Sequence, residues 1–302
     1  MPTLALLEHS PTLLTAVVFV IGLVVGSFLN VVIHRLPKML ERQWRDQCAE
    51  LTVTGHAEGA SAAPEAPFNL VRPRSACPLC QAPIAALHNI PLLAWLWLRG
   101  RCADCHGRIS LRYPLVELLT GLLSALVAWR FGYSMTLLYG LVITWYLVAM
   151  ATIDLDHMLL PDILTLPLMW GGLLASLWAV PATGQHLPVE PRAALLGAIT
   201  GYLLLWTVYQ LFKLTTGKEG MGYGDFKLLA ALGAWMGWKM LLPIVLLSAL
   251  AGALVGIAMI VLKRRSLAHP IPFGPFLAAA GFVVMVWGPE AVTVYLGLFS
   301  IA

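Results

Sequence analysis

Charged residues are scarce in this chain of 302 residues: they make up 11% of it, whereas 59% of the residues are hydrophobic. An average soluble domain carries about 25% charged residues and about 45–50% apolar ones. The composition therefore excludes a soluble enzyme, a secreted disulfide scaffold and a nucleic-acid-binding protein. It is also too apolar for the alternating strands of an outer-membrane barrel, so we expect the membrane spans to be helices.

Apolar runs of membrane-spanning length recur along the chain and predict an all-α polytopic membrane protein with about eight transmembrane helices. The sixth run is short, and we expect it to be tilted or partly buried in the bundle. The first run lacks a preceding basic region and a following cleavage site, so we interpret it as a retained anchor. The runs lie near Leu13–Ile33, Pro114–Arg130, Met135–Thr152, Leu159–Val180, Ala193–Phe212, Phe226–Gly237, Leu241–Leu262 and Phe273–Val294.

Lys and Arg are distributed unevenly between the loops. Eight spans place sixteen of the 19 Lys and Arg residues on one side of the membrane and three on the other. The side rich in positive charge is expected to be the cytoplasm, which leaves both termini in the periplasm. The predicted domains are a first transmembrane helix (1–33), a cytoplasmic domain (34–112) and a seven-helix membrane domain (113–302). Residues 54–67, rich in Ala, Pro and Gly, are expected to be a flexible insert.

Four of the five cysteines form two Cys-x-x-Cys pairs, Cys77 with Cys80 and Cys102 with Cys105, with 21 residues between the pairs. Each pair can present two thiolates to one ion from a tight turn, and two such turns complete a tetrahedral site suited to zinc. Four thiolates leave no open position on the metal, so the pattern predicts a structural zinc ion rather than a catalytic one.

Two disulfides or redox-active pairs are the alternative for these cysteines. Disulfides rarely persist in the cytoplasm, and no βαβ pattern accompanies either pair. His106 could replace one ligand, although four cysteines already suffice. Cys48 is left over, and we interpret it as a free thiol in a loop.

Only fifteen residues are acidic, and four aspartates lie at the predicted cytoplasmic ends of spans: Asp154, Asp156, Asp162 and Asp225. Charge beside hydrocarbon is costly, so each of them is a candidate functional residue. A carboxylate at a helix N-terminus can also serve as a cap, which is the alternative for Asp162 and in part for Asp225. The alternative for Asp156 is a solvated charge at the interface.

Two glycines, Gly222 and Gly224, precede Asp225 with one residue between them. They remove side chains from the backbone ahead of the carboxylate, which allows close approach of another chain such as a substrate peptide. Two carboxylates from different spans can share one proton, so that one activates water while the other protonates the leaving amine. Together with Asp154, this pattern favours aspartic peptide hydrolysis.

A proton- or ion-coupled transporter is the main alternative, because intramembrane carboxylates also relay protons. The acids cluster at span ends rather than at mid-membrane, and no inverted repeat is apparent, so hydrolysis is favoured. A zinc-dependent protease is the second alternative. The chain contains no His-Glu-x-x-His, and the four-cysteine site is closed.

Taken together, the motifs resemble those of the type IV prepilin peptidases, the bifunctional leader peptidase/N-methyltransferases of type IV pilus and type II secretion systems. The resemblance covers nearly the whole chain and shares its Gly-x-Gly-Asp motif with other intramembrane aspartic proteases. It rests on segments 26–37 (GSFLNVVIHRLP), 74–80 (RSACPLC), 100–105 (GRCADC), 109–117 (ISLRYPLVE), 153–162 (IDLDHMLLPD), 222–227 (GYGDFK) and 272–275 (PFGP).

The resemblance implies that Asp154 and Asp225 form the catalytic pair. Asp154 is preferred over Asp156 because of its spacing to Leu160-Pro161. The supporting residues implied are Gly222, Gly224, Asp156 and Lys227.

The resemblance also implies an enzyme of the bacterial inner membrane that acts on prepilins and pseudopilins. It would remove their basic leaders after a glycine on the cytoplasmic side. It would then methylate the new N-terminal residue, often Phe, with S-adenosylmethionine. The extended cytoplasmic domain is the form associated with methylation, but no Gly-rich Rossmann fingerprint indicates the methyl-transfer residues.

Overall fold

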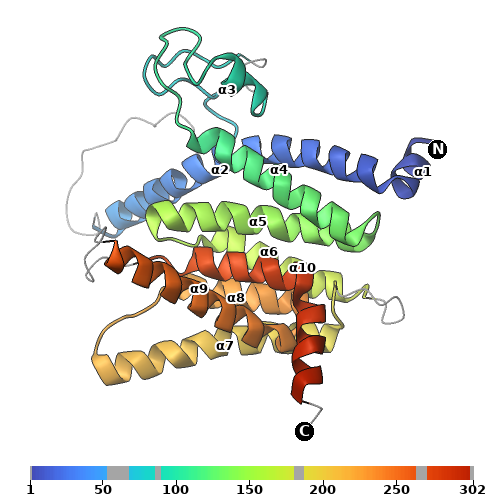
Figure 1. Cartoon of the computed structure of the whole chain (residues 1–302). Coiled ribbons are helices and arrows are strands. Elements are labelled where there is room, and N and C mark those ends of the chain that lie inside the picture. Colours follow the sequence, from blue (N-terminus) through green and yellow to red (C-terminus); the bar gives the residue numbers. More distant parts are fainter. Residues whose placement is uncertain (1, 53–67, 86–89, 180–186, 263–270, 300–302) are drawn as a thin grey trace. The chain divides into compact units, whose positions relative to one another are not determined.

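The computed structural model describes residues 2–52, 68–85, 90–179, 187–262 and 271–299 (Figure 1). In these ranges the chain is helical apart from turns and two isolated β-bridges. Its helices are α1 (Pro2–His9), α2 (Pro11–Thr52), α3 (Leu93–Trp97), α4 (Arg112–Phe131), α5 (Met135–His157), α6 (Asp162–Ser176), α7 (Pro191–Thr216), α8 (Tyr223–Met236), the 3₁₀ turn η3 (Trp238–Met240), α9 (Leu241–Val261) and α10 (Gly274–Phe299).

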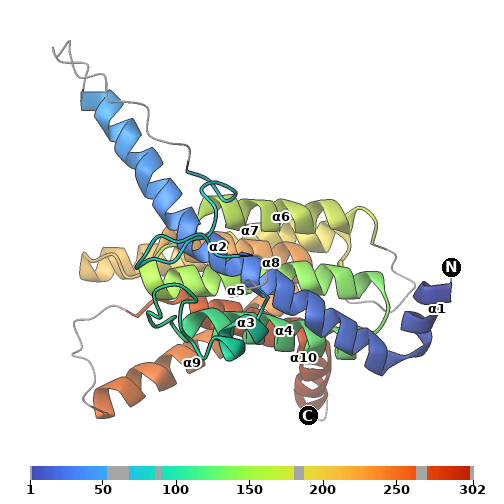
Figure 2. The same cartoon turned by 90° about the horizontal axis from the view of Figure 1, so that it is seen from above.

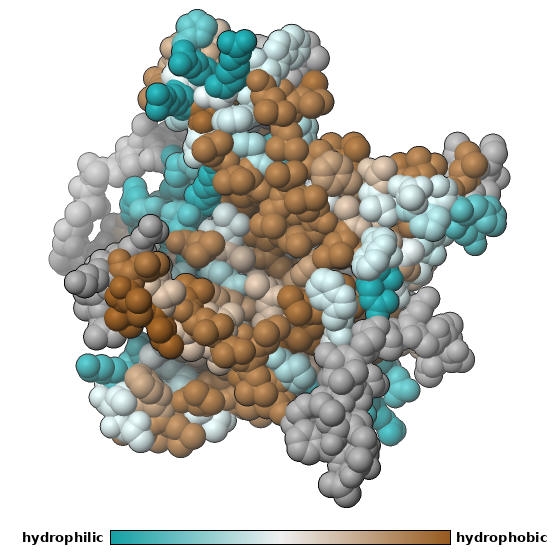
Figure 3. Space-filling model, viewed as in Figure 1, coloured by the Kyte–Doolittle hydropathy of each residue, from teal (hydrophilic) through white to brown (hydrophobic). Residues whose placement is uncertain are grey.

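A helix lies at each of the eight predicted spans, and the all-α membrane class is confirmed. Five helices are long and apolar enough to cross a membrane: those at Pro11–Glu50, Arg112–Phe131, Met135–His157, Pro191–Thr216 and Trp238–Val261. The described parts of α6 and α10 are shorter apolar helices. The outer face of α9 shows the environment of these helices, because Leu242, Leu246, Leu250 and Leu254 are each 57–60% exposed. Such a stripe is suited to lipid rather than water, and Figure 3 shows apolar residues over much of the visible surface.

The first helix differs from its prediction. The apolar run ends near Ile33, but α2 continues through Pro37 to Thr52. Residues 41–50 are mostly polar and exposed, whereas Val32, Ile33 and Leu36 are buried. A hydropathy pattern marks where a helix leaves hydrocarbon, but a helix continues wherever its backbone hydrogen bonds can still form.

The chain folds as two compact units, residues 1–16 with 124–302 and residues 17–123. In the first unit, α8 packs against α6 and α7 and also contacts α10, which in turn packs against α5 (Figure 1, Figure 2). Every residue of α8 from Leu228 to Met236 is buried. The expectation that the short sixth run lies within the bundle is therefore confirmed.

Glycines bring α8 close to its neighbours. Gly197 of α7 lies against Gly233 of α8 so closely that a side chain on either residue would overlap the backbone of the other. On the other flank, a Cβ at Gly172 of α6 would lie 3.0 Å from the carbonyl carbon of Ala234. Small residues let helices in a membrane pack backbone to backbone, and here they hold the helix that carries Asp225.

Candidate functional site

Asp154 lies in the last turn of α5 and is 6% exposed. Its Oδ2 accepts a hydrogen bond from the backbone N–H of Gly274, the first residue of α10, at 3.0 Å. A Cβ at position 274 would lie 2.5 Å from this oxygen, so only glycine lets the N–H approach the carboxylate. The carboxylate is thus held at the positive end of a helix.

Asp225 lies in the first turn of α8 and is also 6% exposed. Its Oδ1 is buried and has no hydrogen-bond partner among the described residues. The residue at the N-cap position is Gly222, so Asp225 is not the N-cap residue itself. A Cβ at Gly222 would have one neighbour, Asp225 Oδ2 at 3.8 Å, which leaves the carboxylate open on this side. A buried, unpaired carboxylate oxygen is costly and is typical of a reactive group.

Leu160 connects the two carboxylates. A Cβ at Gly224, next to Asp225, would lie 2.6 Å from the Leu160 Cβ. A Cβ at Gly274, beside Asp154, would lie 3.1 Å from the Leu160 Cδ1. Leu160 therefore fills the space between two glycines, and each glycine adjoins one carboxylate. The charge of Asp154 acts on Asp225, so the structure brings the two predicted residues into one site.

Asp156 points elsewhere. It is exposed, whereas Asp154 and Ile153 on the same helix are buried. Successive residues of an α-helix are rotated by about 100°, so two residues that are two positions apart face nearly opposite directions. Helix geometry thus separates the two aspartates that the sequence places side by side.

Asp162 and Lys227 form an ion pair between the N-terminal parts of α6 and α8. The Lys227 ammonium donates to both carboxylate oxygens of Asp162, at 2.6 and 2.7 Å. The N-cap position of α6 is occupied by Pro161, so the alternative of Asp162 as a capping residue is wrong. Lys227 lies two residues beyond Asp225, and Asp162 lies two residues beyond Leu160. The pair therefore ties together the two segments that meet at the site.

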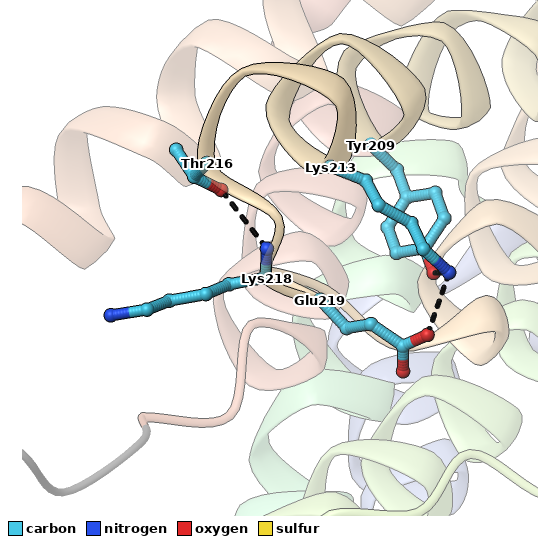
Figure 4. A network of polar contacts seen from close by, with 5 residues as sticks. All are labelled: Tyr209, Lys213, Thr216, Lys218 and Glu219. Atoms are coloured by element: carbon cyan, nitrogen blue, oxygen red, sulfur yellow. Dashed lines mark hydrogen bonds and ion pairs between the residues drawn. The ribbon is translucent and has the colours of Figure 1, made fainter.

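The loop before α8 is held by a second polar network. Lys213 in the last turn of α7 pairs with Glu219 at 2.8 Å and also donates to the Tyr209 hydroxyl (Figure 4). The attraction of Lys213 lowers the pKa of Glu219. Tyr209 and Tyr223 each pack a ring against Phe226, which is fully buried beside Asp225. These contacts fix the backbone that leads into the Gly-x-Gly-Asp segment.

The cysteines lie in the second unit, in two turns of the same design. A β-bridge joins Ala76 to Pro83 around the first turn, and another joins Arg101 to Arg108 around the second. In each turn the N–H of the first cysteine donates to a carbonyl five residues later, at 2.9 Å in both cases. Backbone hydrogen bonds therefore shape both Cys-x-x-Cys turns.

The four cysteine sulfurs lie within 4.8 Å of one another. The Sγ atoms of Cys77 and Cys105 are 3.8 Å apart, far beyond the roughly 2.05 Å of a disulfide. A tetrahedral zinc ion with Zn–S bonds of about 2.3 Å requires S···S separations of about 3.8 Å. The N–H groups of Cys80 and Leu79 lower the pKa of Cys77 from 9.0 to about 7, whereas burial and the neighbouring sulfurs raise the pKa of Cys105 to about 11, so the support for a metal site comes from the geometry of the sulfurs. The cluster fits a metal ion, and the disulfide alternative is not supported. Cys48, exposed in α2, and His106 are not among the four clustered ligands.

The sequence motifs contain Gly274, Leu160 and Asp162, but sequence reasoning missed what these residues contact: the Asp154 carboxylate, the two glycines and Lys227. The segment Pro272–Pro275 is visible in the sequence as a motif, but nothing local shows that its glycine meets a carboxylate 120 residues away. Leu160 is one of many apolar residues. Only the packing of α5, α8 and α10 reveals what each of them contacts.

Two family models match the chain. The model described as Bacterial Peptidase A24 N-terminal domain matches residues 20–131, and the model of the Type IV leader peptidase family matches residues 141–257. No solved structure matches the chain.

Proteins named prepilin leader peptidase/N-methyltransferase are similar over almost their whole length. Those of Aeromonas hydrophila and Pseudomonas aeruginosa are 54% and 50% identical over 98% of each chain. That of Legionella pneumophila is 44% identical over 97% of this chain and 98% of its own. These names describe enzymes and do not support the transporter alternative. The chain therefore belongs to the type IV leader peptidase family.

Proposed function

We propose that this protein removes the basic leader from type IV prepilins and type II secretion pseudopilins after a glycine, and then N-methylates the new N-terminal residue. One observation carries the peptidase half: two buried carboxylates, Asp154 and Asp225, come from different helices to one site, where Gly222 leaves Asp225 open on one side. The enzyme names of the relatives, at up to 54% identity, support both halves.

In the proposed cleavage step, Asp154 activates the attacking water and Asp225 holds the proton that the leaving nitrogen receives. Gly274 donates a hydrogen bond to Asp154 and so stabilises and orients its carboxylate. Oδ1 of Asp225 has no donor nearby among the described residues, which suits an oxygen that must carry and release a proton. After cleavage the two groups exchange protonation states through the next water.

Four residues support the catalytic pair: three act on the geometry of the site, and one acts on the substrate leader. Gly222 leaves room for the extended substrate backbone beside Asp225, and Gly224 lets Leu160 pack next to it. Lys227 holds the start of α8 against α6 through its pair with Asp162. Asp156, exposed on the opposite side of α5, could interact with the basic leader. An exposed pair of this kind contributes little, about 1 kcal/mol at most.

Cys77, Cys80, Cys102 and Cys105 would hold a structural zinc ion, because their sulfurs match the size and charge of a closed tetrahedral site. The methyl group would come from S-adenosylmethionine, which supplies an activated methyl when it is bound. The metal would make the folding of the cysteine turns conditional on binding, since metal-binding energy in such a domain is folding energy.

The membrane placement follows from charge. Sixteen of the 19 Lys and Arg residues lie on the side that we assign to the cytoplasm of the bacterial inner membrane. Both termini would then be periplasmic, and the ends of α5 and α8 that carry the carboxylates would face the cytoplasm. A prepilin with its apolar helix in the bilayer would present its scissile bond at the same depth.

Incubation of the purified full-length protein with a prepilin and S-adenosylmethionine tests both activities at once. Mass spectrometry of the product should show loss of the leader and a gain of one methyl group. A product that is neither cut nor methylated would refute the proposal. Retention of cleavage in the presence of a strong chelator would argue against a zinc-dependent protease.

A further inference from the structure

The second unit contains a buried carboxylate that none of the assigned roles uses. Glu117, in the second turn of α4, is 9% exposed, whereas the other described acids of this unit, Glu41, Asp46, Glu50 and Asp104, are all exposed. Its Oε2 accepts the backbone N–H of Leu92 at 2.9 Å, and the Ser27 hydroxyl also donates to it.

Within the described residues, no cation compensates this charge. Both donors to Glu117 are neutral groups. The buried cation of the unit, Arg35, is directed elsewhere, because its guanidinium donates to the carbonyls of Asn69 and Leu70 at 2.9 and 3.4 Å. A buried carboxylate without a positive partner is costly, because it must either take up a proton or be compensated by a cation.

The position of Glu117 is fixed by a close helix crossing. A Cβ at Gly26 of α2 would lie 2.8 Å from the Cα of Glu117, so the two helix backbones are almost in contact. One turn away, the Asn30 amide donates to the Tyr113 carbonyl at 3.0 Å. Both helices are thus locked beside the carboxylate, which is the rigid support that a recognition group needs.

The chain between the two cysteine pairs is tied to the same carboxylate. Leu92 belongs to this connection, and its backbone, with φ of 57° and ψ of −48°, forms the centre of a γ-turn that the Leu93 N–H closes on the Pro91 carbonyl at 2.6 Å. Leucine rarely adopts a positive φ, and in this conformation the N–H of Leu92 donates to Glu117. The metal centre and the buried carboxylate are therefore coupled through one short segment.

We propose that Glu117 recognises the free amino terminus of the cleaved substrate for N-methylation, an inference that rests on the proposed function. The substrate of that step is a primary amine, which is an ammonium ion at neutral pH and therefore the cation that Glu117 lacks. Glu117 lies in the region matched by the N-terminal family model, outside the region matched by the peptidase model.

Transfer of the methyl group to the amine requires that the substrate ammonium first lose one proton. The substrate binds beside Glu117 as the ammonium ion. It then gives one proton to the solvent before reaction, and the freed nitrogen lone pair forms the new N–C bond with the methyl group of the sulfonium donor. The C–S bond breaks, and its electron pair stays on sulfur, which becomes neutral. The methylated nitrogen then carries the extra positive charge, which the Glu117 carboxylate stabilises or removes as a proton.

Peptide binding to the full-length protein in nanodiscs tests the recognition directly. The probes are a synthetic peptide of a mature pilin N-terminus with a free amine and the same peptide with an acetylated amine. The wild type should prefer the free amine, and Glu117→Gln should weaken free-amine binding by roughly 10- to 100-fold while leaving acetylated binding unchanged. Equal preference in the wild type and in Glu117→Gln would overturn the proposal.

The controls separate recognition from a purely structural role. The amide of Glu117→Gln can still accept the Leu92 N–H, and Glu117→Asp keeps the charge if the Gln variant folds poorly. Asn30→Ala removes a bond between the same two helices, and Glu41→Gln removes an exposed carboxylate of the same unit. Neither control should abolish the amine preference. If Asn30→Ala does so as strongly as Glu117→Gln, the role of Glu117 is structural.

Activity assays distinguish failure of this inference from failure of the proposed function. Glu117→Gln should lose methylation of a pre-cleaved pilin, while leader removal and zinc content stay at wild-type levels. If the wild type itself does not methylate, the proposed function is wrong. If the wild type methylates and Glu117→Gln methylates equally well, only the assignment of Glu117 is wrong.

Discussion

The two functional regions of this protein are built in opposite ways. The cysteine centre is local: each half is a short turn closed by its own backbone hydrogen bonds, and its ligands span residues 77–105. The carboxylate pair is long-range, because Asp154, Asp225 and Gly274 come from three helices and meet only when these helices pack. A local site depends on its ligands, whereas a long-range site also depends on every small residue that lets the helices approach.

The largest effect is expected from substitutions that remove the acid–base chemistry of the carboxylate pair. Asp154→Asn and Asp225→Asn keep the shape of the side chain but cannot exchange a proton, so each should reduce leader removal by roughly 10²–10⁴-fold or more. Methylation of a pre-cleaved pilin should persist in both variants. Asp156→Asn is the matched control, and a paired assay of cleavage and methylation gives the measurement. Wild-type cleavage by Asp154→Asn, or loss of cleavage in Asp156→Asn alone, would contradict the assignment.

Substitutions in the cysteine centre should reduce metal binding and local folding rather than the chemistry of cleavage. Cys77→Ser or Cys102→Ser removes one of four ligands, so the protein should lose bound metal and the cysteine turns should become more susceptible to protease. Methylation should fall at least as much as cleavage. Cys48→Ser should keep both the metal and the activities, because Cys48 lies outside the cluster. Elemental analysis that finds no zinc in the wild-type protein would end this interpretation.

Packing around the pair should matter nearly as much as its chemistry. Gly274→Ala places a Cβ 2.5 Å from Asp154 Oδ2, so the carboxylate or the start of α10 must move. Misplacement by about 1 Å can cost on the order of 10²-fold in rate, and we expect a loss of cleavage of that size. Gly256→Ala in α9 is the control, since the nearest atom to its Cβ would be 3.8 Å away. Equal activity of the two variants would show that the Gly274 contact is dispensable.

The smallest effects should come from the ion pairs that support the site. Breaking the pair with Asp162→Asn should lower cleavage several-fold, and the exchange Asp162→Lys with Lys227→Asp should restore part of it. Breaking the Lys213–Glu219 pair with Glu219→Gln should change the rate by less than about fivefold, because exposed pairs contribute little. A thermal melt of each variant separates the loss of activity from the loss of folding.

The pH dependence of the Lys213–Glu219 pair has a defined sign. Lys213 lowers the pKa of Glu219 in the folded protein, so the pair stabilises the loop above the pKa of an unfolded Glu. This stabilisation is lost as the pH falls through the lowered pKa. The wild type and Glu219→Gln should therefore differ in melting temperature at neutral pH and converge in acid. A difference that grows in acid would contradict the assignment of the pair.

The sequence by itself determined the membrane class, the positions of eight helices, both cysteine turns and the candidate acids. These features depend on composition or on residues a few positions apart, where hydropathy, spacing and turn geometry act directly. It could not show that α2 continues to Thr52, because a helix can extend beyond its apolar stretch.

The tertiary structure alone showed which groups surround each aspartate. It buries Asp154 and exposes Asp156 through helix rotation, and it pairs Asp162 with Lys227. It also places Gly274 against a carboxylate 120 residues away. Such contacts arise from the fit of several helices at once, so no local pattern contains them. The physical reason is that packing of side chains and glycines sets which faces meet, and burial then gives a few polar groups their energetic weight.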